Sequence, residues 1–375
     1  MAIINGTSGD DTLNGTSSSD QIFGFGGNDT LNGNGGNDQL DGGTGADTMS
    51  GGTGSDIYFV DDVGDVVIEA AGEGNDQVRT TLAAYMLGAN VEKLRFTGSG
   101  SFAGTGNDLN NEIQGGSSAD TLIGGDGWDF IIGLGGDDSL YGGADGDTLD
   151  GGSGADYLEG NSGDDVYLVD NSGDVVVEAA GEGTDEVYTT LTAYTLGANV
   201  ENLYFNAGGG IAFHGIGNGL DNLLYGQSGD DTLEGGGGND ELRGNVGNDT
   251  LIGGDGDDLI VGASGADTMT GGNGADTFRI GYFESGTGSS ADRITDFVSG
   301  DIIDVAGWDA DINTAGNQAF SFVGGAAFTG TAGELRAFFD GVDTWVQGDI
   351  TGDGMADFEI ALTGSVTLMS TDFIL

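Results

Sequence analysis

An apolar residue recurs every nine positions through most of the chain, near the end of a glycine-rich unit that reads GGxGxDxLx. Six such units cover residues 6–59, seven cover 106–168 and seven cover 217–279. The eighth position is apolar in all twenty units, from Leu13 to Phe278. Because side chains alternate between the two faces of a strand, a three-residue strand centred on this position points it into a core. The pattern therefore predicts a short strand in every unit.

The rest of each unit predicts a tight turn. Glycine adopts positive φ angles without strain and lets neighbouring backbones approach closely, which is its usual use in turns. One unit then forms half of a coil, and two units form an eighteen-residue coil of a flattened solenoid. The chain is predicted to be all-β, with a parallel β-roll in three runs, β-rich inserts and a C-terminal β domain.

Two related inserts separate the runs. Residues 64–78 read GDVVIEAAGEGNDQV and residues 173–187 read GDVVVEAAGEGTDEV, which indicates a duplication. Their alternating strands are predicted to extend the solenoid as spacers. The alternative is a ligand platform made of their acidic residues. Those residues are Asp65, Glu69, Glu73 and Asp76 in the first copy, and Asp174, Glu178, Glu182 and Asp185 in the second.

The predicted domain boundaries follow from the runs and the inserts. From residue 280 the nine-residue period is lost, and alternating stretches predict an antiparallel or mixed β domain. Within that domain, residues 349–354 read DITGDG, which favours a single weak calcium site and an ordinary hairpin turn about equally. The six segments are 1–59, 60–105, 106–168, 169–216, 217–279 and 280–375.

Charge and composition limit the classes of molecule that the chain is expected to bind. The 375 residues include 63 acidic and 7 basic side chains, for a formal net charge of −56. This balance argues against nucleic acid and anionic membranes as partners, and no apolar stretch is long enough to span a membrane. With no cysteine there is no disulfide framework, so a bound metal ion is expected to stabilise the fold instead. Residues 1–5 show no secretory leader, so we expect any export signal elsewhere.

The sixth position of the units predicts the metal sites. Stacked coils bring these aspartates to about 4.8 Å, where two carboxylates repel by roughly 3 kcal/mol, so a few uncompensated pairs outweigh the stability of an ordinary domain. Oxygen ligands from carboxylates and turn carbonyls favour Ca²⁺ over Mg²⁺, and one histidine with no cysteine argues against softer metals. The predicted calcium ligands are Asp11, Asp20, Asp29, Asp38, Asp47, Asp56, Asp120, Asp129, Asp138, Asp147, Asp156, Asp165, Asp231, Asp240, Asp249, Asp258, Asp267 and Asp276.

The repeated units resemble the RTX, or haemolysin-type, calcium-binding nonapeptide repeats. The resemblance implies a parallel β-roll that holds Ca²⁺ between successive coils, with Asp29 bridging ions shared with Asp11 and Asp47. It also implies that turn carbonyls complete the shells. The carbonyls proposed on this basis are those of Gly33, Gly36, Gly42 and Gly45. Ser18 and the pair Asp145-Gly146 depart from the motif.

Residues 280–375 resemble the C-terminal domain of serralysin-type secreted metalloproteases. The similar stretches are DRITDF, GTAGELR and GDITGDGMADFEI. The zinc motif HExxHxxGxxH is absent, so the resemblance implies export without protease activity. The ending TDFIL resembles the termini of substrates of type I secretion exporters.

These features predict a secreted calcium-binding protein that folds on calcium outside the cell, as a surface, matrix or adhesion component. The expected partners are calcium ions and a type I exporter, with cell-surface or matrix polysaccharide or self-association as further options. An accessory module in extracellular polysaccharide modification is the alternative. A glycan-acting enzyme is disfavoured, because one histidine and no cysteine provide no nucleophilic triad. We therefore expect no catalytic site, and His214 is expected to be a surface or packing residue.

Overall fold

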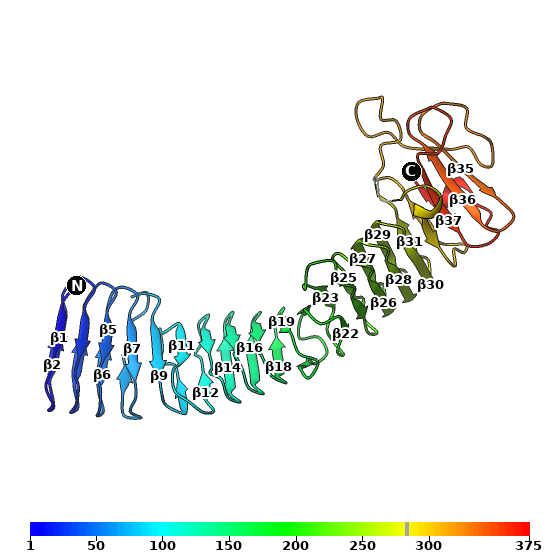
Figure 1. The fold of residues 1–375 in the computed structure, drawn as a ribbon. Helices are drawn as coiled ribbons and strands as arrows, with labels where there is room; N and C mark the ends of the chain where they lie inside the picture. The colour runs from blue at the N-terminus through cyan, green and yellow to red at the C-terminus, as the bar shows by residue number, and fades with distance from the viewer. Residues whose placement is uncertain (282–284) are drawn as a thin grey trace. The chain divides into compact units, whose positions relative to one another are not determined.

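The computed structural model describes residues 1–281 and 285–375, and its regular elements are almost all short β-strands (Figure 1). Two 3-10 turns, Gly288–Ser290 and Ser370–Asp372, are the only helical elements in these ranges. The chain divides into two compact units, Met1–Asp185 and Glu186–Leu375. None of the helices within the described ranges has the length and apolarity that a membrane crossing requires.

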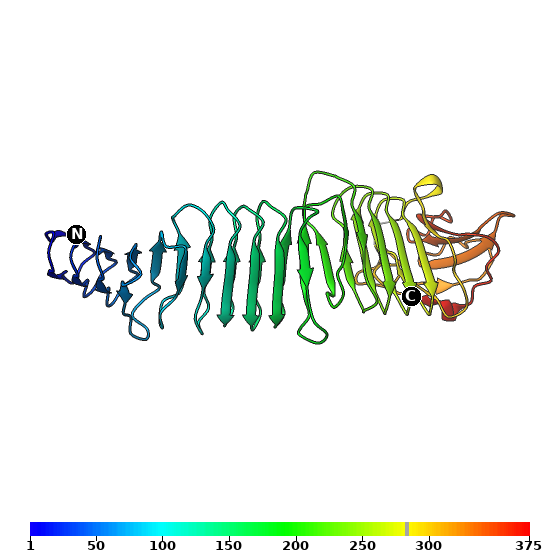
Figure 2. The same cartoon turned by 90° about the horizontal axis from the view of Figure 1, so that it is seen from below.

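The first unit is a parallel β-solenoid whose strands stack along two sides (Figure 2). One side holds β1 (Ile3–Asn5), β3 (Gln21–Phe23), β5 (Gln39–Asp41), β7 (Ile57–Val60), β9 (Gln77–Thr80), β11 (Lys93–Phe96), β13 (Glu112–Gln114), β15 (Phe130–Ile132), β17 (Thr148–Asp150) and β19 (Val166–Val169). The other side holds a sheet of β2 (Thr12–Asn14), β4 (Thr30–Asn32), β6 (Thr48–Ser50) and β8 (Val66–Val67), and a sheet of β10 (Ala84–Met86), β12 (Ala103–Thr105), β14 (Thr121–Asp126), β16 (Ser139–Ala144), β18 (Tyr157–Ser162) and β20 (Val175–Val177).

The register confirms the eighteen-residue coil. Leu31 pairs with Met49 on one side of the solenoid, and Leu140 pairs with Leu158 in a later coil. The apolar eighth-position residues form the core, and nineteen of the twenty have no exposed surface. Leu13 is the exception and is half-buried, because its strand β2 pairs with β4 alone and no earlier coil covers it.

The first insert continues this solenoid with coils of unequal length, as the sequence predicts. Tyr58 pairs with Val78, Val78 with Leu94, and Leu94 with Ile113, so successive coils advance by 20, 16 and 19 residues. All four side chains are fully or almost fully buried. The apolar ladder therefore runs through the insert although the nine-residue period does not.

The second unit contains a further stretch of parallel solenoid. Its first side holds β21 (Glu186–Thr189), β23 (Asn202–Phe205), β25 (Leu223–Tyr225), β27 (Glu241–Val246), β29 (Leu259–Ser264), β31 (Thr277–Arg279), β33 (Ile302–Asp304) and β38 (Phe373–Ile374). Its second side holds β22 (Ala193–Thr195), β24 (His214–Ile216), β26 (Thr232–Gly237), β28 (Thr250–Asp255), β30 (Thr268–Asn273), β32 (Asp292–Ile294), β37 (Phe358–Leu362), β36 (Thr344–Asp349), β35 (Glu334–Phe339) and β34 (Ser321–Phe322).

The C-terminal part of this unit is a mixed β structure, as expected. Strands β35, β36 and β37 are antiparallel, whereas β37 pairs in parallel with β32 of the solenoid. Solenoid pairing also passes residue 279, since Phe278 pairs with Ile303 and Met269 with Ile294. The period is lost at residue 280 because the next coil is 25 residues long, and not because the solenoid ends there.

Candidate metal centre

The predicted aspartates line the interior of the turns and are not solvated. Seventeen of the eighteen are buried, with at most 3% of their surface exposed. We call the sixth-position aspartates that stack along one edge of successive coils a column. Asp11, at the start of its column, is half-buried. A carboxylate removed from water needs hydrogen bonds, a counter-charge or a proton.

One oxygen of each buried carboxylate is accounted for by the backbone. Oδ1 accepts a hydrogen bond from the N–H of the column residue one coil earlier, as when Asp29 N donates to Asp47 Oδ1 at 2.6 Å and Asp129 N donates to Asp147 Oδ1 at 2.8 Å. The same bond recurs along both edges of the coils at 2.6–3.0 Å. Each column is thus a ladder of side chain to backbone bonds that fixes the orientation of the carboxylates.

The other oxygen is buried and lacks a hydrogen-bond partner in most of the columns. Within the described ranges, this holds for the Oδ2 atoms of Asp29, Asp38, Asp47, Asp56, Asp129, Asp138, Asp147, Asp156, Asp165, Asp240, Asp249, Asp258 and Asp276. Asp20, by contrast, uses Oδ2 to accept the N–H of Thr16 at 2.7 Å. Rows of buried, unpartnered carboxylate oxygens are what a row of cations would satisfy.

Glycine carbonyls lie beside these oxygens. A Cβ placed on Gly24 would overlap Asp29 Oδ2 and lie 2.5 Å from the carbonyl oxygen of Gly42. A Cβ on Gly15 would likewise lie 2.5 Å from the carbonyl oxygen of Gly33. The glycine at the first position of the unit therefore leaves a small space lined by carboxylate and carbonyl oxygens.

The other two proposed glycines have different surroundings. The carbonyl oxygen of Gly36 lies against Gly54, one coil later. Gly45 has a φ of 133°, and a Cβ placed on it would overlap the carbonyl oxygen of Gly27, so it provides the left-handed backbone of its turn. The carbonyl oxygens of Gly33 and Gly42, in contrast, border the space beside Asp20 and Asp29.

Burial strongly perturbs the carboxyl groups. It raises the pKa of Asp147 to about 8, against the opposing effect of the hydrogen bond from the Asp129 backbone, and the neighbouring carboxylates of Asp129 and Asp165 raise it further. Burial also raises the pKa of Asp129 and of Asp249 to about 7. Without a cation, the fold therefore favours the protonated form.

The donor set fits Ca²⁺. Carboxylate Oδ2 atoms and glycine carbonyls are hard oxygen ligands on flexible turns, which suits the six to eight ligands of calcium better than the strict octahedron of magnesium. Bound calcium would supply the positive charge that the columns lack, and the aspartates would hold it from successive coils.

The space beside the columns predicts the effect of a single methyl group. Gly133→Ala would overlap Asp138 Oδ2 and lie 2.6 Å from the carbonyl oxygen of Gly151, so we expect it to destabilise the calcium-loaded protein by about 1–3 kcal/mol. Gly9→Ala is the matched control, because its Cβ would meet no atom within 4 Å. The measurement is thermal unfolding in calcium. Equal midpoints for the two variants would show that the oxygen-lined space beside the column is not needed for stability.

The raised pKa values predict that acid partly replaces calcium. In the folded state Asp129, Asp147 and Asp249 bind protons up to about pH 7 or 8, whereas in the unfolded chain they release them near 3.8. Protons thus favour the folded state across this window, and its stability falls as the pH rises through it. In chelator, β-sheet circular dichroism is expected to increase from pH 8 to pH 5. A constant or decreasing signal would contradict this expectation.

Some column members escaped the sequence prediction because their spacing is irregular. Asp292 Oδ1 accepts the N–H of Asp267 at 3.0 Å, and Asp301 Oδ1 accepts that of Asp276 at 3.2 Å, each across 25 residues. The stretches DRI and SGDII keep an aspartate two residues before a buried apolar residue, and this signal could have found them. Asp145, in the unit that departs from the motif, adopts the left-handed φ of 70°.

Other residues singled out in the sequence play structural parts. His214 is a half-exposed surface residue whose Nε2 lies 2.9 Å from Glu234 Oε1. Asp349 uses both carboxylate oxygens to accept the N–H groups of Gly352 and Gly354, at 2.6 and 2.9 Å. This arrangement favours a turn over a calcium site at residues 349–354.

Two family models match the chain. The RTX calcium-binding nonapeptide repeat (4 copies) matches residues 5–40, 23–58, 32–67, 105–140, 132–167 and 141–176. The C-terminal segment of the M10 peptidases, described as "Peptidase M10 serralysin C terminal", matches residues 232–375. Neither match is to a protease domain.

Individual relatives match shorter regions. A protein of Rhizobium meliloti, "Endo-1,3-1,4-beta-glycanase ExsH", is 46% identical over 66 residues, which are 18% of this chain and 14% of the relative. The chain therefore spans only a small part of that protein.

Solved structures with similar segments come from the Azotobacter vinelandii mannuronan C5-epimerase. Its AlgE6R3 subunit is 30% identical over 42% of this chain and 78% of its own, with a TM-score of 0.22. Its AlgE6R2 subunit is 28% identical over 42% of this chain and 90% of its own, with a TM-score of 0.24. On the family matches and the aspartate columns, the chain carries RTX calcium-binding nonapeptide repeats, which imply calcium binding, and a C-terminal segment similar to that of the serralysins.

Proposed function

We propose that this chain is a secreted, non-enzymatic protein that stays unfolded in the low-calcium cytosol and folds as it binds calcium outside the cell. The observation that carries the proposal is the set of buried carboxylate oxygens without hydrogen-bond partners. Where a metal site forms only in the folded state, the free energy of metal binding becomes free energy of folding. Calcium concentration would then decide where the chain folds.

Export through a type I exporter suits such a chain, because an unfolded polypeptide can pass a narrow channel. The likeness of residues 232–375 to the serralysin C-terminal segment supports this route. The folded protein would act as a surface or matrix component that adheres or self-associates, with calcium as its structural ion. The single histidine, half-exposed and paired with Glu234, offers no support for an active site.

The experiment is to produce the chain in cells with and without a type I exporter and to follow it by immunoblot. We expect export only with the exporter, retention on the cell surface in millimolar calcium, and release by a chelator. A chain that accumulates inside the cell in a folded, protease-resistant form would overturn the proposal.

A role as an accessory module in polysaccharide modification is the second candidate. Trp128 is 68% exposed and lines an open hollow with Asp145, Gly146, Gly163 and Asp164, and an exposed ring beside carboxylates can stack on a sugar. The similarity of 66 residues to a glycanase adds to this candidate. Calcium-dependent retention on an immobilised acidic polysaccharide, lost in Trp128→Ala, would favour it over a purely structural role.

A further inference from the structure

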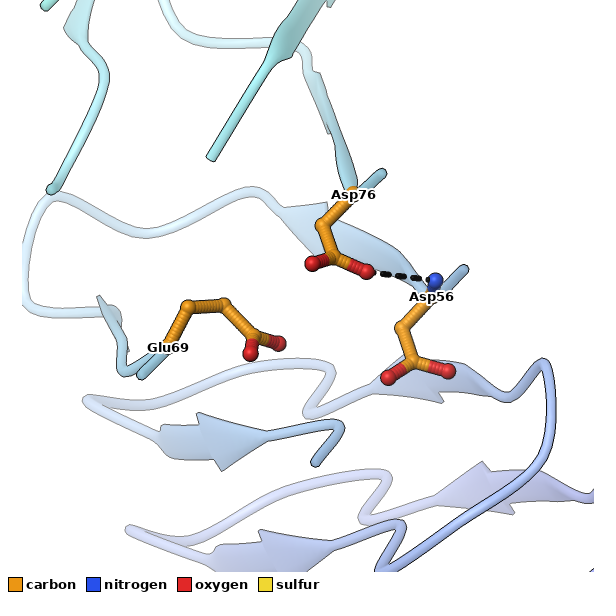
Figure 3. Close-up of side chains that lie close together, drawn as sticks. All are labelled: Asp56, Glu69 and Asp76. Atoms are coloured by element: carbon orange, nitrogen blue, oxygen red, sulfur yellow. Dashed lines mark hydrogen bonds between the residues drawn. The ribbon is translucent and has the colours of Figure 1, made fainter. Parts of the chain in front are cut away.

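A separate carboxylate cluster lies where the first insert meets the preceding run. Asp56, Glu69 and Asp76 are all buried, and each directs a carboxylate oxygen to within 4.8 Å of the others. Figure 3 shows the side chain of Glu69 extending toward the two aspartates. The second insert repeats the arrangement with Asp165, Glu178 and Asp185, 109 residues later in each case.

The oxygens of the first cluster lack the partners that a buried carboxylate needs. Glu69 is only 9% exposed, and neither of its carboxylate oxygens has a hydrogen-bond partner. The Oδ2 atoms of Asp56 and Asp76 are buried and without partners too. None of the ion pairs in the described ranges involves these residues. Three buried carboxylates this close together are unfavourable unless a cation or protons lie between them.

A tyrosine hydroxyl completes the surroundings. Tyr58 occupies the apolar eighth position of its unit, and its hydroxyl accepts the N–H of Gly51 at 2.6 Å. A Cβ on Gly51 would overlap Asp56 Oδ2 and lie 2.5 Å from this hydroxyl, so both oxygens border one small space. In the second copy the hydroxyl of Tyr167 accepts the N–H of Gly160 and donates to Glu178.

The third run provides an internal contrast. The eighth position of its last unit is Phe278, which has no hydroxyl, where the other two runs have Tyr58 and Tyr167. The described part of the chain holds only the two groups of three carboxylates named above. The glutamate and the tyrosine thus occur together at both places where an insert follows a run, and the third run has no tyrosine at the equivalent position.

We propose that Asp56, Glu69 and Asp76 form a calcium site at the end of their column in which a glutamate from outside the repeat joins two aspartates, and that Asp165, Glu178 and Asp185 form its duplicate. Three carboxylates give a charge of −3 and an all-oxygen donor set, which suits Ca²⁺. In each copy the glutamate and the second aspartate come from the insert, and the first aspartate comes from the last unit of the preceding run. The ion would therefore hold the insert against the roll at the point where the nine-residue repeat is broken.

The competing possibility is a proton-sharing cluster in which the glutamate is neutral and no ion binds. Replacing Glu69 and Glu178 by glutamine distinguishes the two. Glutamine keeps the shape and the hydrogen-bonding capacity of a protonated glutamate, so a proton-sharing cluster would tolerate it. A calcium site would lose its central ligand and one negative charge.

The experiment counts calcium in the folded full-length chain by equilibrium dialysis at saturating ⁴⁵Ca²⁺. We expect the double variant Glu69→Gln/Glu178→Gln to bind two fewer ions than the wild type. The matched control is Glu73→Gln/Glu182→Gln, which removes the same charges from side chains that accept the N–H groups of Ala70 and Ala179. We expect its ion count to be unchanged.

An unchanged count in the first variant, or an equal loss in the control, would overturn the proposal. If the first variant fails to fold, anomalous diffraction from calcium-loaded wild-type crystals decides the matter. A peak between Asp56, Glu69 and Asp76 would support the site, and no peak there alongside occupied repeat columns would overturn it.

The inference rests on the proposed calcium-dependent function, but the two proposals fail separately. A wild type that binds no calcium contradicts both of them, whereas an unchanged ion count in the first variant contradicts only the carboxylate cluster.

Discussion

Removing calcium from the folded chain with a chelator at pH 8 is expected to abolish most of its β-sheet circular dichroism, and adding calcium back is expected to restore it cooperatively. The buried column carboxylates cause this effect. At pH 8 most of them are charged in the unfolded chain, whereas folding without an ion forces them either to bind protons or to repel one another. The seven basic residues cannot compensate 63 acidic ones.

The size of the effect follows from linkage. An ion that binds only the folded state at 100 times its Kd adds about 2.7 kcal/mol of stability. A few such ions match the whole net stability of an ordinary domain, which is about 5–15 kcal/mol. Because the columns stack from coil to coil, binding at one site orders the next, and the titration should be steeper than for independent sites.

Magnesium at the same concentration is the control for this titration. It demands a near-ideal octahedron and gives up its water reluctantly, so the turn carbonyls should not suffice to bind it, and we expect little recovery of signal. A full β-sheet signal in chelator at pH 8 would contradict metal-driven folding. Full recovery with magnesium would instead contradict the assignment to calcium.

The sequence predicted the parts of the fold that repeat with strict spacing. Ile22, Leu40 and Tyr58 stand 18 residues apart and form one continuous buried ladder, because a period of nine leaves a single way to stack the strands. The same spacing placed Asp29 and Asp47 next to each other. It could not show that one oxygen of each carboxylate is held by the backbone of the preceding coil, since that bond depends on the conformation of the turn.

The irregular parts were harder to predict, for a physical reason. Glu69 reaches Asp56 and Asp76 across 13 and 7 residues, and no fixed spacing links the three positions. The coil that brings Asp292 under Asp267 is 25 residues long, so its aspartate was out of phase with the repeat. Coil length can vary while the pairing of the strands is kept, and a search by period misses the residues that such coils bring together.

Asp147→Asn is expected to have opposite effects on stability with and without calcium. Asp147 lies in the middle of its column, is 1% exposed, and has an Oδ2 without a hydrogen-bond partner. In chelator at pH 8 the change removes a buried charge, so the variant should retain more β-sheet signal than the wild type. In calcium it removes a ligand, and a 10- to 100-fold loss of affinity would lower the thermal midpoint by on the order of 5 °C.

Asn111 and Asn222 show that an uncharged amide fits the sixth position. Asn222 is buried, and its Nδ2 donates to the carbonyl oxygens of Val200 and Glu201 at 3.2 and 3.0 Å. A loss of stability by Asp147→Asn in calcium would therefore report the missing ligand and not a steric conflict.

The matched variant for this measurement is Asp11→Asn. Asp11 is half-buried at the start of its column, and its Oδ2 accepts the N–H of Thr7 at 2.6 Å, so both effects should be smaller there. Thermal unfolding of the two variants and the wild type, in calcium and in chelator, gives the four differences needed. If Asp147→Asn moved stability in the same direction under both conditions, the buried carboxylates would be structural acids that need no ion. Opposite signs at Asp147, with little change at Asp11, would show that the interior of the column is where calcium contributes to the fold.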